Sequence, residues 1–428
     1  MMRALHPVFE VERPRPPASK LGDLLRQRAS KFVAIGVCLY LGGLVLPIGI
    51  GWNGSLLFLA SIGLLSVLFI PPTRCRKDTQ LYKSVLVFLA SFLASLLVSE
   101  DIGASTRLST PLLPGILLFL LMAENFQDLK DVRSFFATFS VAGLGLGLHL
   151  LWTVWKNPGM QPLEWISEAG SDLLVVPNDV TLLAVIAPFS LALLFSGSAI
   201  SVKVLAAFSL VVSILSVCLF QSRGATLVMF VAVGLASAIM RPRWALKLGL
   251  LTLILILLLD GLLGFQFVGK ITSTANWTQR IPLWLTALSM FSKAPLLGHG
   301  PHLFALQYQY YLKTVTLPGW VLVENYPSSW AHNLFLETLC QQGILGFTAF
   351  SFMLCVALSS TRKAMSNPNA EARILGAGAM TSLLAFCIAA TFELTLMRHW
   401  VILVLFGLLS IISCLSVQPL ERKELSLC

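Results

Sequence analysis

Charged residues are scarce in this chain. Only 12% of its 428 residues are Asp, Glu, Lys or Arg, and ordinary soluble domains carry about twice that fraction. Hydrophobic residues make up 56% of the chain, and its mean hydropathy is +0.82. This balance excludes a soluble globular domain and indicates a protein whose solvent is the lipid bilayer.

Several motifs typical of soluble enzymes are also missing. The eight cysteines form no CxxC pair and mostly lie within apolar runs, which favours structural cysteines over a zinc or redox site. The segment Gly298-His299-Gly300 lacks the GK[ST] of a phosphate-binding loop, which excludes a nucleotide site and favours a simple bend. The expected outer face has no tight carboxylate cluster that would hold Mg²⁺ or Mn²⁺. His299 and His302 are suitably spaced for a metal, but only the remote His332 is available as a third ligand. We therefore expect neither a metal nor a cofactor.

Long apolar runs predict an all-α, polytopic membrane protein. A helix needs roughly 18 to 20 apolar residues to cross a bilayer, and no segment shows the alternating pattern of a membrane barrel. The runs predict about twelve transmembrane helices, near 32–50, 54–70, 81–99, 111–123, 134–155, 174–196, 201–220, 224–240, 244–268, 333–358, 374–392 and 399–417.

The distribution of Lys and Arg predicts the orientation of these helices. Of the 30 basic residues, 22 fall in alternate segments that include both ends of the chain, and eight fall in the others. Because basic residues favour the cytoplasmic side, both termini are expected to be cytoplasmic. The net charge of +10 is thereby explained by topology. The basic residues form no dense stripe, so no nucleic-acid partner is needed.

These patterns divide the chain into five parts. Residues 1–31 form a cytoplasmic tail, because they are basic and proline-rich and carry no cleavable signal. Residues 32–268 hold the first nine transmembrane helices, 269–331 form one large periplasmic loop, 332–417 hold the last three helices, and 418–428 form a second cytoplasmic tail.

The periplasmic loop is long and rich in aromatic residues, which favours a functional loop over a disordered one. Apolar residues recur at helical spacing within 279–292, and Pro282 suits a first helical turn. We predict an interfacial helix there, with its apolar face on membrane lipids. An aromatic belt that only anchors the loop is the simpler alternative for its tryptophans and tyrosines.

Three polar positions on the outer face are candidates for a functional site. Arg223 is squeezed between two apolar runs, so it lies at or just below the outer membrane surface, where it either snorkels or binds an anion. Arg280 leads the amphipathic segment and is either a solvated loop residue or a second anion ligand. His332 directly precedes an apolar run, so its imidazole is either structural or suited to base chemistry near neutral pH.

The order of these motifs resembles the O-antigen ligase family. The matching motifs are Ser222-Arg223-Gly224, Gln279-Arg280 followed by Trp284, the run 294–300, and Ala331-His332-Asn333 followed by the run 343–346. Pro177-Asn178, before the apolar run 180–196, is similar to a further family pattern. The resemblance covers roughly residues 175–400, and residues 1–170 match in hydropathy alone.

The resemblance implies a glycan-transfer reaction at the periplasmic face. Members of this family move a glycan from undecaprenyl diphosphate to an acceptor hydroxyl, usually on the lipid A-core, without a metal or nucleotide cofactor. Arg223 and Arg280 would hold the diphosphate, and His332 would accept the proton of the attacking hydroxyl in an inverting displacement. Asn178 and Asn333 lie within the matching motifs and would be supporting residues. Independently of the resemblance, Glu393 and the pair Arg398-His399 bracket the last outer turn, where Glu393 and Arg398 either form an outer-face salt bridge or support the site.

Three alternatives remain open on the sequence alone. The acceptor could be another lipid-linked repeat, as in a polysaccharide polymerase, or a protein Ser or Thr, as in a protein O-oligosaccharyltransferase. A membrane transporter is an alternative of a different class, because a branch related to this family is assigned to bicarbonate uptake. A transporter predicts polar residues in the middle of its crossings. The Arg and His residues of this chain gather instead at the outer boundary.

Overall fold

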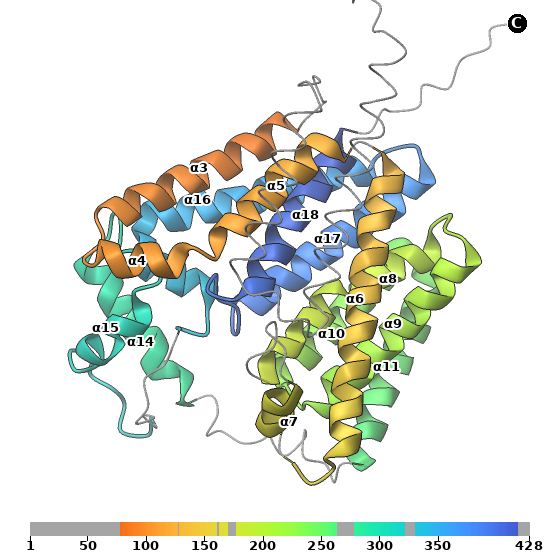
Figure 1. Cartoon of the computed structure of the whole chain (residues 1–428), viewed down its shortest axis with the longest axis horizontal. Coiled ribbons are helices and arrows are strands. Elements are labelled where there is room, and N and C mark those ends of the chain that lie inside the picture. Colours follow the sequence, from red (N-terminus) through yellow and green to blue (C-terminus); the bar gives the residue numbers. More distant parts are fainter. Residues whose placement is uncertain are drawn as a thin grey trace, which may run out of the picture.

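The computed structural model describes residues 78–126, 128–160, 162–169, 177–262, 278–321 and 330–417, and all elements within these ranges are helical (Figure 1). The predicted crossings at 32–50 and 54–70, and both predicted cytoplasmic tails, lie outside the described residues. The helices are α3 (Thr79–Leu97), α4 (Ile102–Ser109), α5 (Leu112–Asn125), α6 (Leu129–Lys156), α7 (Pro162–Ala169), the 3-10 turn η1 (Pro177–Val180), α8 (Thr181–Phe195), α9 (Ile200–Leu219), α10 (Arg223–Met240), α11 (Pro242–Leu262), α14 (Arg280–Lys293), α15 (Phe304–Leu312), α16 (Leu334–Met365), α17 (Ala370–Ala390) and α18 (His399–Ser416).

Seven of the described helices are long and apolar enough to cross a membrane, and they make this chain a membrane protein. They are α3, α6, α9, α10, α16, α17 and α18. An eighth crossing is possible if α4 and α5, which meet at a bend of 47°, form one broken span. The number twelve therefore stays a prediction. The predicted crossing at 174–196 is shorter than expected, because the 3-10 turn at Pro177 occupies its start and the α-helix begins only at Thr181.

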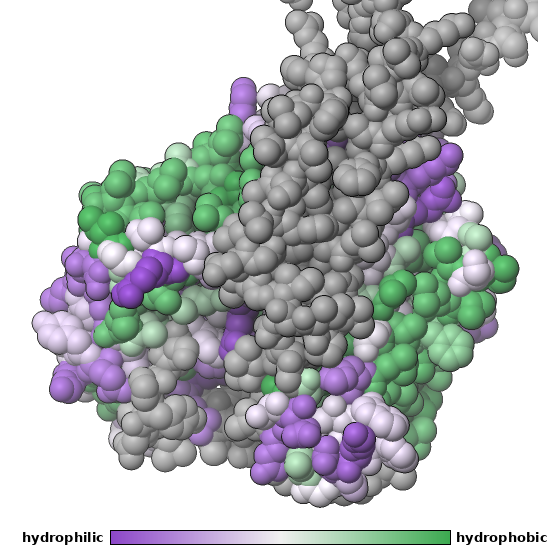
Figure 2. All heavy atoms as spheres, viewed as in Figure 1, coloured by the Kyte–Doolittle hydropathy of each residue, from purple (hydrophilic) through white to green (hydrophobic). Residues whose placement is uncertain are grey.

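The helices pack around α18, which is buried along nearly its whole length. Helix α3 lies beside α16, and α5 lies beside α18, while α8 packs against α9, α10 and α17 (Figure 1). Large apolar side chains are exposed on α3, α9 and α11, for example Leu93, Phe208 and Leu257. Such faces form part of the apolar surface in Figure 2 and are suited to contact lipid tails.

Helix α16 contains a sharp kink at Gly343, where φ is 65° and ψ is −169°. A Cβ at this position would lie 2.3 Å from the carbonyl group of Leu296, so both the conformation and the space require glycine. The kink frees backbone groups that bond to the loop before α15: the Gly300 amide donates to Gln341, and the Ile344 amide donates to Pro295. The motifs at 294–300 and 343–346 are thus two sides of one backbone contact.

Helix α14 confirms a helix within the predicted periplasmic loop. Its buried residues, Leu283, Ala287 and Met290 among them, pack against α15 and α16. The predicted apolar stripe lies on the half-exposed side, where Leu288 is 44% exposed. The helix therefore has one face on protein and another face free for lipid, and its position at the membrane interface stays a prediction.

A buried carboxylate ties three helices together at the end of the molecule opposite α14. The Asp78 side chain caps the first turn of α3 and accepts hydrogen bonds from Ser360 of α16 and Ser416 of α18, at 2.5 and 2.9 Å. Burial by itself raises the pKa of the Asp78 carboxyl, but these donors and the nearby Lys363 outweigh it, so the pKa lies below its ordinary value. The ionised carboxylate is therefore the form that stabilises the fold.

Replacing Asp78 is expected to weaken this end of the bundle. Asp78→Ala should lower the free energy of unfolding by about 1 to 3 kcal/mol at pH 7, because buried hydroxyls lose their acceptor. Folding lowers the pKa of Asp78 below its unfolded value near 3.8. Asp78 therefore contributes its full share of the free energy of unfolding above pH 3.8, and this share is lost as the pH falls through the lower pKa of the folded state. Thermal unfolding of purified protein in detergent between pH 3 and pH 7 measures both effects. Ser366→Ala, which removes an exposed hydroxyl, is the control. If the difference in stability between wild type and Asp78→Ala stays constant down to pH 3, the ionised carboxylate is not the stabilising form.

Candidate active site

Three predicted site residues stand at the starts of three helices. Arg223 is the first residue of α10, Arg280 is the first residue of α14, and His332 precedes Asn333, the N-cap of α16. A helix N-terminus carries unpaired amide groups and a partial positive charge. The sequence therefore places two cations and a titratable imidazole where the backbone already favours an anion.

The start of α16 fixes the direction of His332. The Asn333 side chain accepts hydrogen bonds from the amides of Phe335 and Leu336, both at 3.0 Å, and so caps the helix. His332 itself has a φ of 51°, in the left-handed region that non-glycine residues seldom adopt. Such strained backbone clusters at functional sites. Asn333 thus caps the helix directly after His332, and its role as a supporting residue stays a prediction.

The start of α10 is built in the same way. Gln221 has a φ of 52°, and the Ser222 hydroxyl then caps the helix by accepting from the Ala225 amide at 3.3 Å. Gly224 follows Arg223, and a Cβ at Gly224 would lie 2.4 Å from the ring of Phe392. The glycine of this motif therefore allows α10 to approach the turn at 391–398 closely.

That turn, between α17 and α18, brings Arg280 and His332 together. The Arg280 guanidinium donates to the carbonyl oxygen of Phe392, and its Nη2 lies 2.9 Å from Oε2 of Glu393. The other oxygen of Glu393, Oε1, lies 3.4 Å from Nδ1 of His332. The Glu393 side chain is only 5% exposed, whereas those of Arg280 and His332 are 23% and 25% exposed. One buried carboxylate thus orients both groups and leaves part of each open to solvent.

Arg223 reaches the same region from α10. It is close enough to Arg280 for the two positive charges to interact. Two cations held together in this way favour a ligand with at least two negative charges. The structure therefore brings Arg280 and His332 to one carboxylate, and it places the start of α10 against the same turn through the contact of Gly224 with Phe392.

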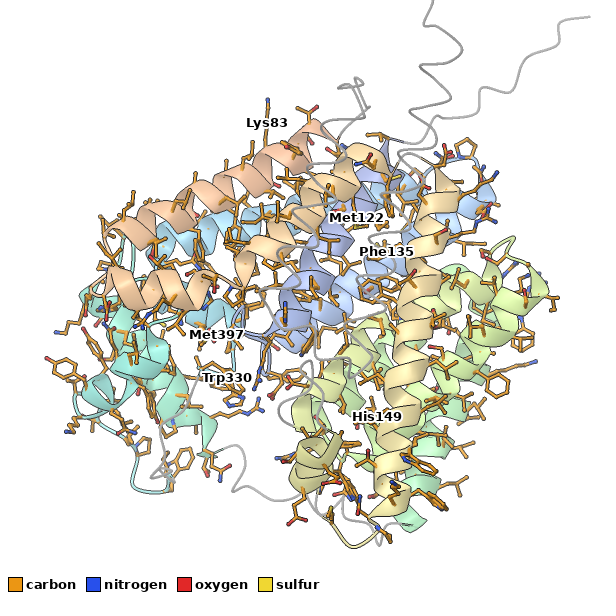
Figure 3. All side chains as sticks on the ribbon, viewed as in Figure 1. Lys83, Met122, Phe135, His149, Trp330 and Met397 are labelled. Atoms are coloured by element: carbon orange, nitrogen blue, oxygen red, sulfur yellow. The ribbon has the colours of Figure 1, made fainter. Side chains whose placement is uncertain are left out.

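A second chain of contacts reaches His332 through the ring of Trp330. The imidazole lies against the Trp330 ring, with 4.8 Å between centroids, and the Arg398 guanidinium lies 4.5 Å above the same ring. Nη1 of Arg398 lies 3.7 Å from Oδ2 of Asp179, and Oδ1 of the same carboxylate accepts from the Trp400 indole at 3.1 Å. In Figure 3, Trp330 lies in the middle of the molecule, between α14 and α10.

These contacts reassign the supporting residues. Glu393 and Arg398 both enter ion pairs, but with Arg280 and Asp179 and not with each other. Asp179 was missed on the sequence, although an acidic residue just before an apolar run on the outer face was the available signal. The side chain of its neighbour Asn178 lies outside the described residues, so its supporting role stays a prediction.

The two histidines of the loop before α15 lie in a different cluster. His299 bonds through its two ring nitrogens to Glu100 and to the carbonyl oxygen of Met290. His302 is almost fully buried, and this burial lowers the pKa of its imidazole to about 4. Neither histidine contacts Arg280 or His332 through any interaction that the described part of the chain reveals.

Residues 208–351 match the family model described as O-antigen ligase. This segment runs from α9 into α16 and contains Arg223, Arg280 and His332, whereas Glu393 and Arg398 follow it. No curated protein matches the chain. The match supports glycan transfer of the ligase or polymerase type, from a lipid-linked donor to a glycan acceptor, and it confirms the resemblance predicted from the polar motifs. Residues 208–351 of the chain are thus similar to the O-antigen ligase family.

Proposed function

We propose that the chain transfers a glycan from undecaprenyl diphosphate to an acceptor hydroxyl at the periplasmic face of the inner membrane. The observation that carries this proposal is the meeting of Arg280 and His332 on the buried Glu393 carboxylate, with Arg223 beside them. An anion site next to a titratable imidazole is the pairing that transfer from a diphosphate carrier requires.

The two arginines are assigned to the diphosphate of the donor. A guanidinium is always charged and presents a planar set of donors that fits phosphate oxygens in pairs. Both arginines begin helices, so nearby backbone amides add to the positive potential. As the bond between the sugar and the diphosphate breaks, negative charge grows on the leaving diphosphate, and fixed cations there stabilise the transition state.

His332 is assigned to the acceptor hydroxyl. Its Nδ1 is buried 3.4 Å from the Glu393 carboxylate without a hydrogen bond to the described residues, so we assign the proton to that nitrogen and the role of acceptor to Nε2. Nε2 then takes the hydroxyl proton while the hydroxyl oxygen forms the new bond to the sugar carbon. The bond to undecaprenyl diphosphate breaks on the opposite side, which inverts the configuration. The protein residues supply all proton transfer, so the proposal requires no metal.

The lipid A-core is the acceptor we propose, because O-antigen ligation is the activity for which the family is described. A transfer assay in proteoliposomes tests it directly. Undecaprenyl-diphosphate-linked glycan is supplied with lipid A-core, with a second copy of the lipid-linked glycan, or with a Ser- and Thr-containing peptide. Transfer to the second or third acceptor alone would identify a polymerase or a protein O-oligosaccharyltransferase. Bicarbonate uptake by the same vesicles, without any transfer, would overturn the proposal in favour of a transporter.

The proposal requires Arg280 and His332 to be periplasmic. We expect Lys313→Cys, in the predicted periplasmic loop, to react with a membrane-impermeant maleimide in intact spheroplasts, because 269–331 is predicted to lie outside. Ser366→Cys, in the predicted cytoplasmic loop at 359–373, is the matched control and should react only after permeabilisation. Both cysteines are placed in a variant without the eight native ones. The reverse labelling pattern would reject the orientation and the mechanism together.

Replacing Glu393 tests the link between the Arg280 guanidinium and the His332 imidazole. Glu393→Gln keeps the size of the side chain but removes the charge that pairs with Arg280 and His332. We expect about a tenfold lower transfer rate, since losing a group that orients a reactive residue commonly has an effect of this size. Thr391→Val, which removes an exposed hydroxyl from the same turn, is the control. Unchanged transfer by Glu393→Gln would show that the carboxylate charge is dispensable.

A further inference from the structure

Another buried carboxyl group, on Glu337, lies in the first turn of α16, close to the site but unused by the proposed mechanism. Its residue is 2% exposed. Oε1 accepts a hydrogen bond from the Thr395 hydroxyl at 2.6 Å, and the Gln341 side chain lies 3.5 Å from the same oxygen. The backbone of Ala331, directly before His332, lies near enough to interact with the same carboxyl group. Glu337 thus touches the chain on both sides of the site.

Thr395 shapes the turn that carries Glu393 and Arg398. Its residue is fully buried. Its hydroxyl donates to Glu337 and accepts from the Met397 amide at 3.2 Å, and its carbonyl oxygen accepts from the Arg398 amide at 3.3 Å. A shift of this threonine would therefore move the end of the turn that leads into α18, two residues after Glu393.

We propose that Glu337 and Thr395 form a buried clamp that sets the distance between Glu393 and His332. This inference rests on the proposed function, since it explains how the site assigned to glycan transfer is held together. Glu337 belongs to the helix that follows His332, and Thr395 belongs to the turn that presents Glu393. The bond between them joins the two halves of the site beneath its reactive groups, and both are positioning residues.

The chemistry of the clamp accounts for the residue types. The Thr395 hydroxyl accepts from the Met397 amide and donates its proton to Glu337, so the partner at position 337 must be an acceptor. Oε2 of Glu337 has no hydrogen-bond partner within the described part of the chain. A buried carboxyl oxygen without a partner is unfavourable, and groups of this kind in native proteins call for an explanation. If Glu337 only stabilised the first turn of α16, its proximity to Ala331 would be explained. Its hydrogen bond to Thr395, in the turn between α17 and α18, would not be explained.

The clamp makes three predictions for the transfer assay. Glu337→Ala and Thr395→Val should each lower the transfer rate at least tenfold, because small misplacements of reacting groups have large effects on rate. The double variant should be no slower than Thr395→Val alone, since both changes break the same bond. Glu337→Gln and Thr395→Ser keep the acceptor and the donor, so they should restore the rate to within about threefold of wild type. Ser382→Ala, which removes a buried bond between α17 and α8, is the matched control and should leave the rate unchanged.

Hydrogen exchange gives a readout that does not depend on activity. In Glu337→Ala, amides in the turn at 391–398 should exchange faster, while those in the middle of α17 keep the wild-type rate. If the wild-type protein transfers no glycan, the proposed function fails and the exchange data still test the clamp. If the wild type is active but Glu337→Ala retains both its rate and its slow exchange, the clamp is overturned. A double variant whose loss equals the product of the two single losses would equally reject it.

Discussion

His332→Ala is expected to lower the rate of glycan transfer by about 10²- to 10⁴-fold, which is the range of general-base assistance. The imidazole stands at a capped helix start with Nδ1 directed at Glu393, so its other nitrogen is the one available to the acceptor hydroxyl. Binding of the undecaprenyl-diphosphate donor should stay nearly normal, because the arginines and not the imidazole are assigned to the diphosphate. Single-turnover transfer and donor binding, measured on the same purified variant, separate the two effects.

Asn333→Ser serves as the control for this variant. Serine is also a good N-cap, so the start of α16 is kept while the residue beside His332 changes. A rate for His332→Ala within about tenfold of wild type, in folded and membrane-inserted protein, would contradict the assignment of the base. Loss of donor binding in the same variant would instead make the imidazole a ligand of the diphosphate.

Hydropathy located the helices because lipid leaves the backbone few alternatives. A segment that faces hydrocarbon must satisfy its own hydrogen bonds, so an apolar run of sufficient length is helical. Hydropathy does not locate where a helix ends, however. Helix α16 was predicted to end at 358 but continues to Met365, since its last turns are polar and extend beyond the apolar run. Helix α6 was predicted from 134 but begins at Leu129, where Asp131 accepts from the Asp128 amide at 3.1 Å.

The candidate site was predictable in its parts but not in its assembly. Arg223, Arg280 and His332 stand out on the sequence because polar residues beside apolar runs are unfavourable without a role. Nothing on the sequence pairs Glu393 with Arg280, which lies 113 positions earlier, because that contact depends on how α14 packs on α16 and how α17 meets α18. Asp179 and Glu337 were missed for the same reason, since their roles appear only through partners on distant helices.

The glycines of the motifs show again that contacts between distant segments cannot be predicted from the sequence. Gly224 and Gly343 were noticed as parts of a family pattern, without a physical reason for glycine. The structure supplies the reasons, which are the ring of Phe392 against α10 and the carbonyl of Leu296 against the kink in α16. Both reasons are close approaches between segments far apart in the chain, which no local pattern encodes.

Arg280→Ala is expected to weaken binding of the undecaprenyl-diphosphate donor by about 100-fold or more. Each hydrogen bond to a charged group contributes about 1.5 to 3 kcal/mol, and a guanidinium makes such bonds to phosphate oxygens in pairs. Arg223→Ala should have a similar effect, because the two cations lie close together and are assigned to one diphosphate. Isothermal titration of the purified variants with donor in detergent measures the change.

Replacement by lysine distinguishes geometry from charge. Arg280 already uses its guanidinium to contact the Phe392 carbonyl and Glu393, and the group has further donors to offer a ligand. A lysine ammonium on a flexible stem cannot hold both contacts of the turn and still present paired donors to phosphate. Arg280→Lys should therefore weaken donor binding by about tenfold even though the charge is kept. Lys293→Ala, at the far end of α14, changes the net charge of the same helix without touching the site, so it should bind donor normally. Full donor binding by Arg280→Lys would mean that charge alone holds the diphosphate, and the planar geometry of arginine would then have no part in recognition.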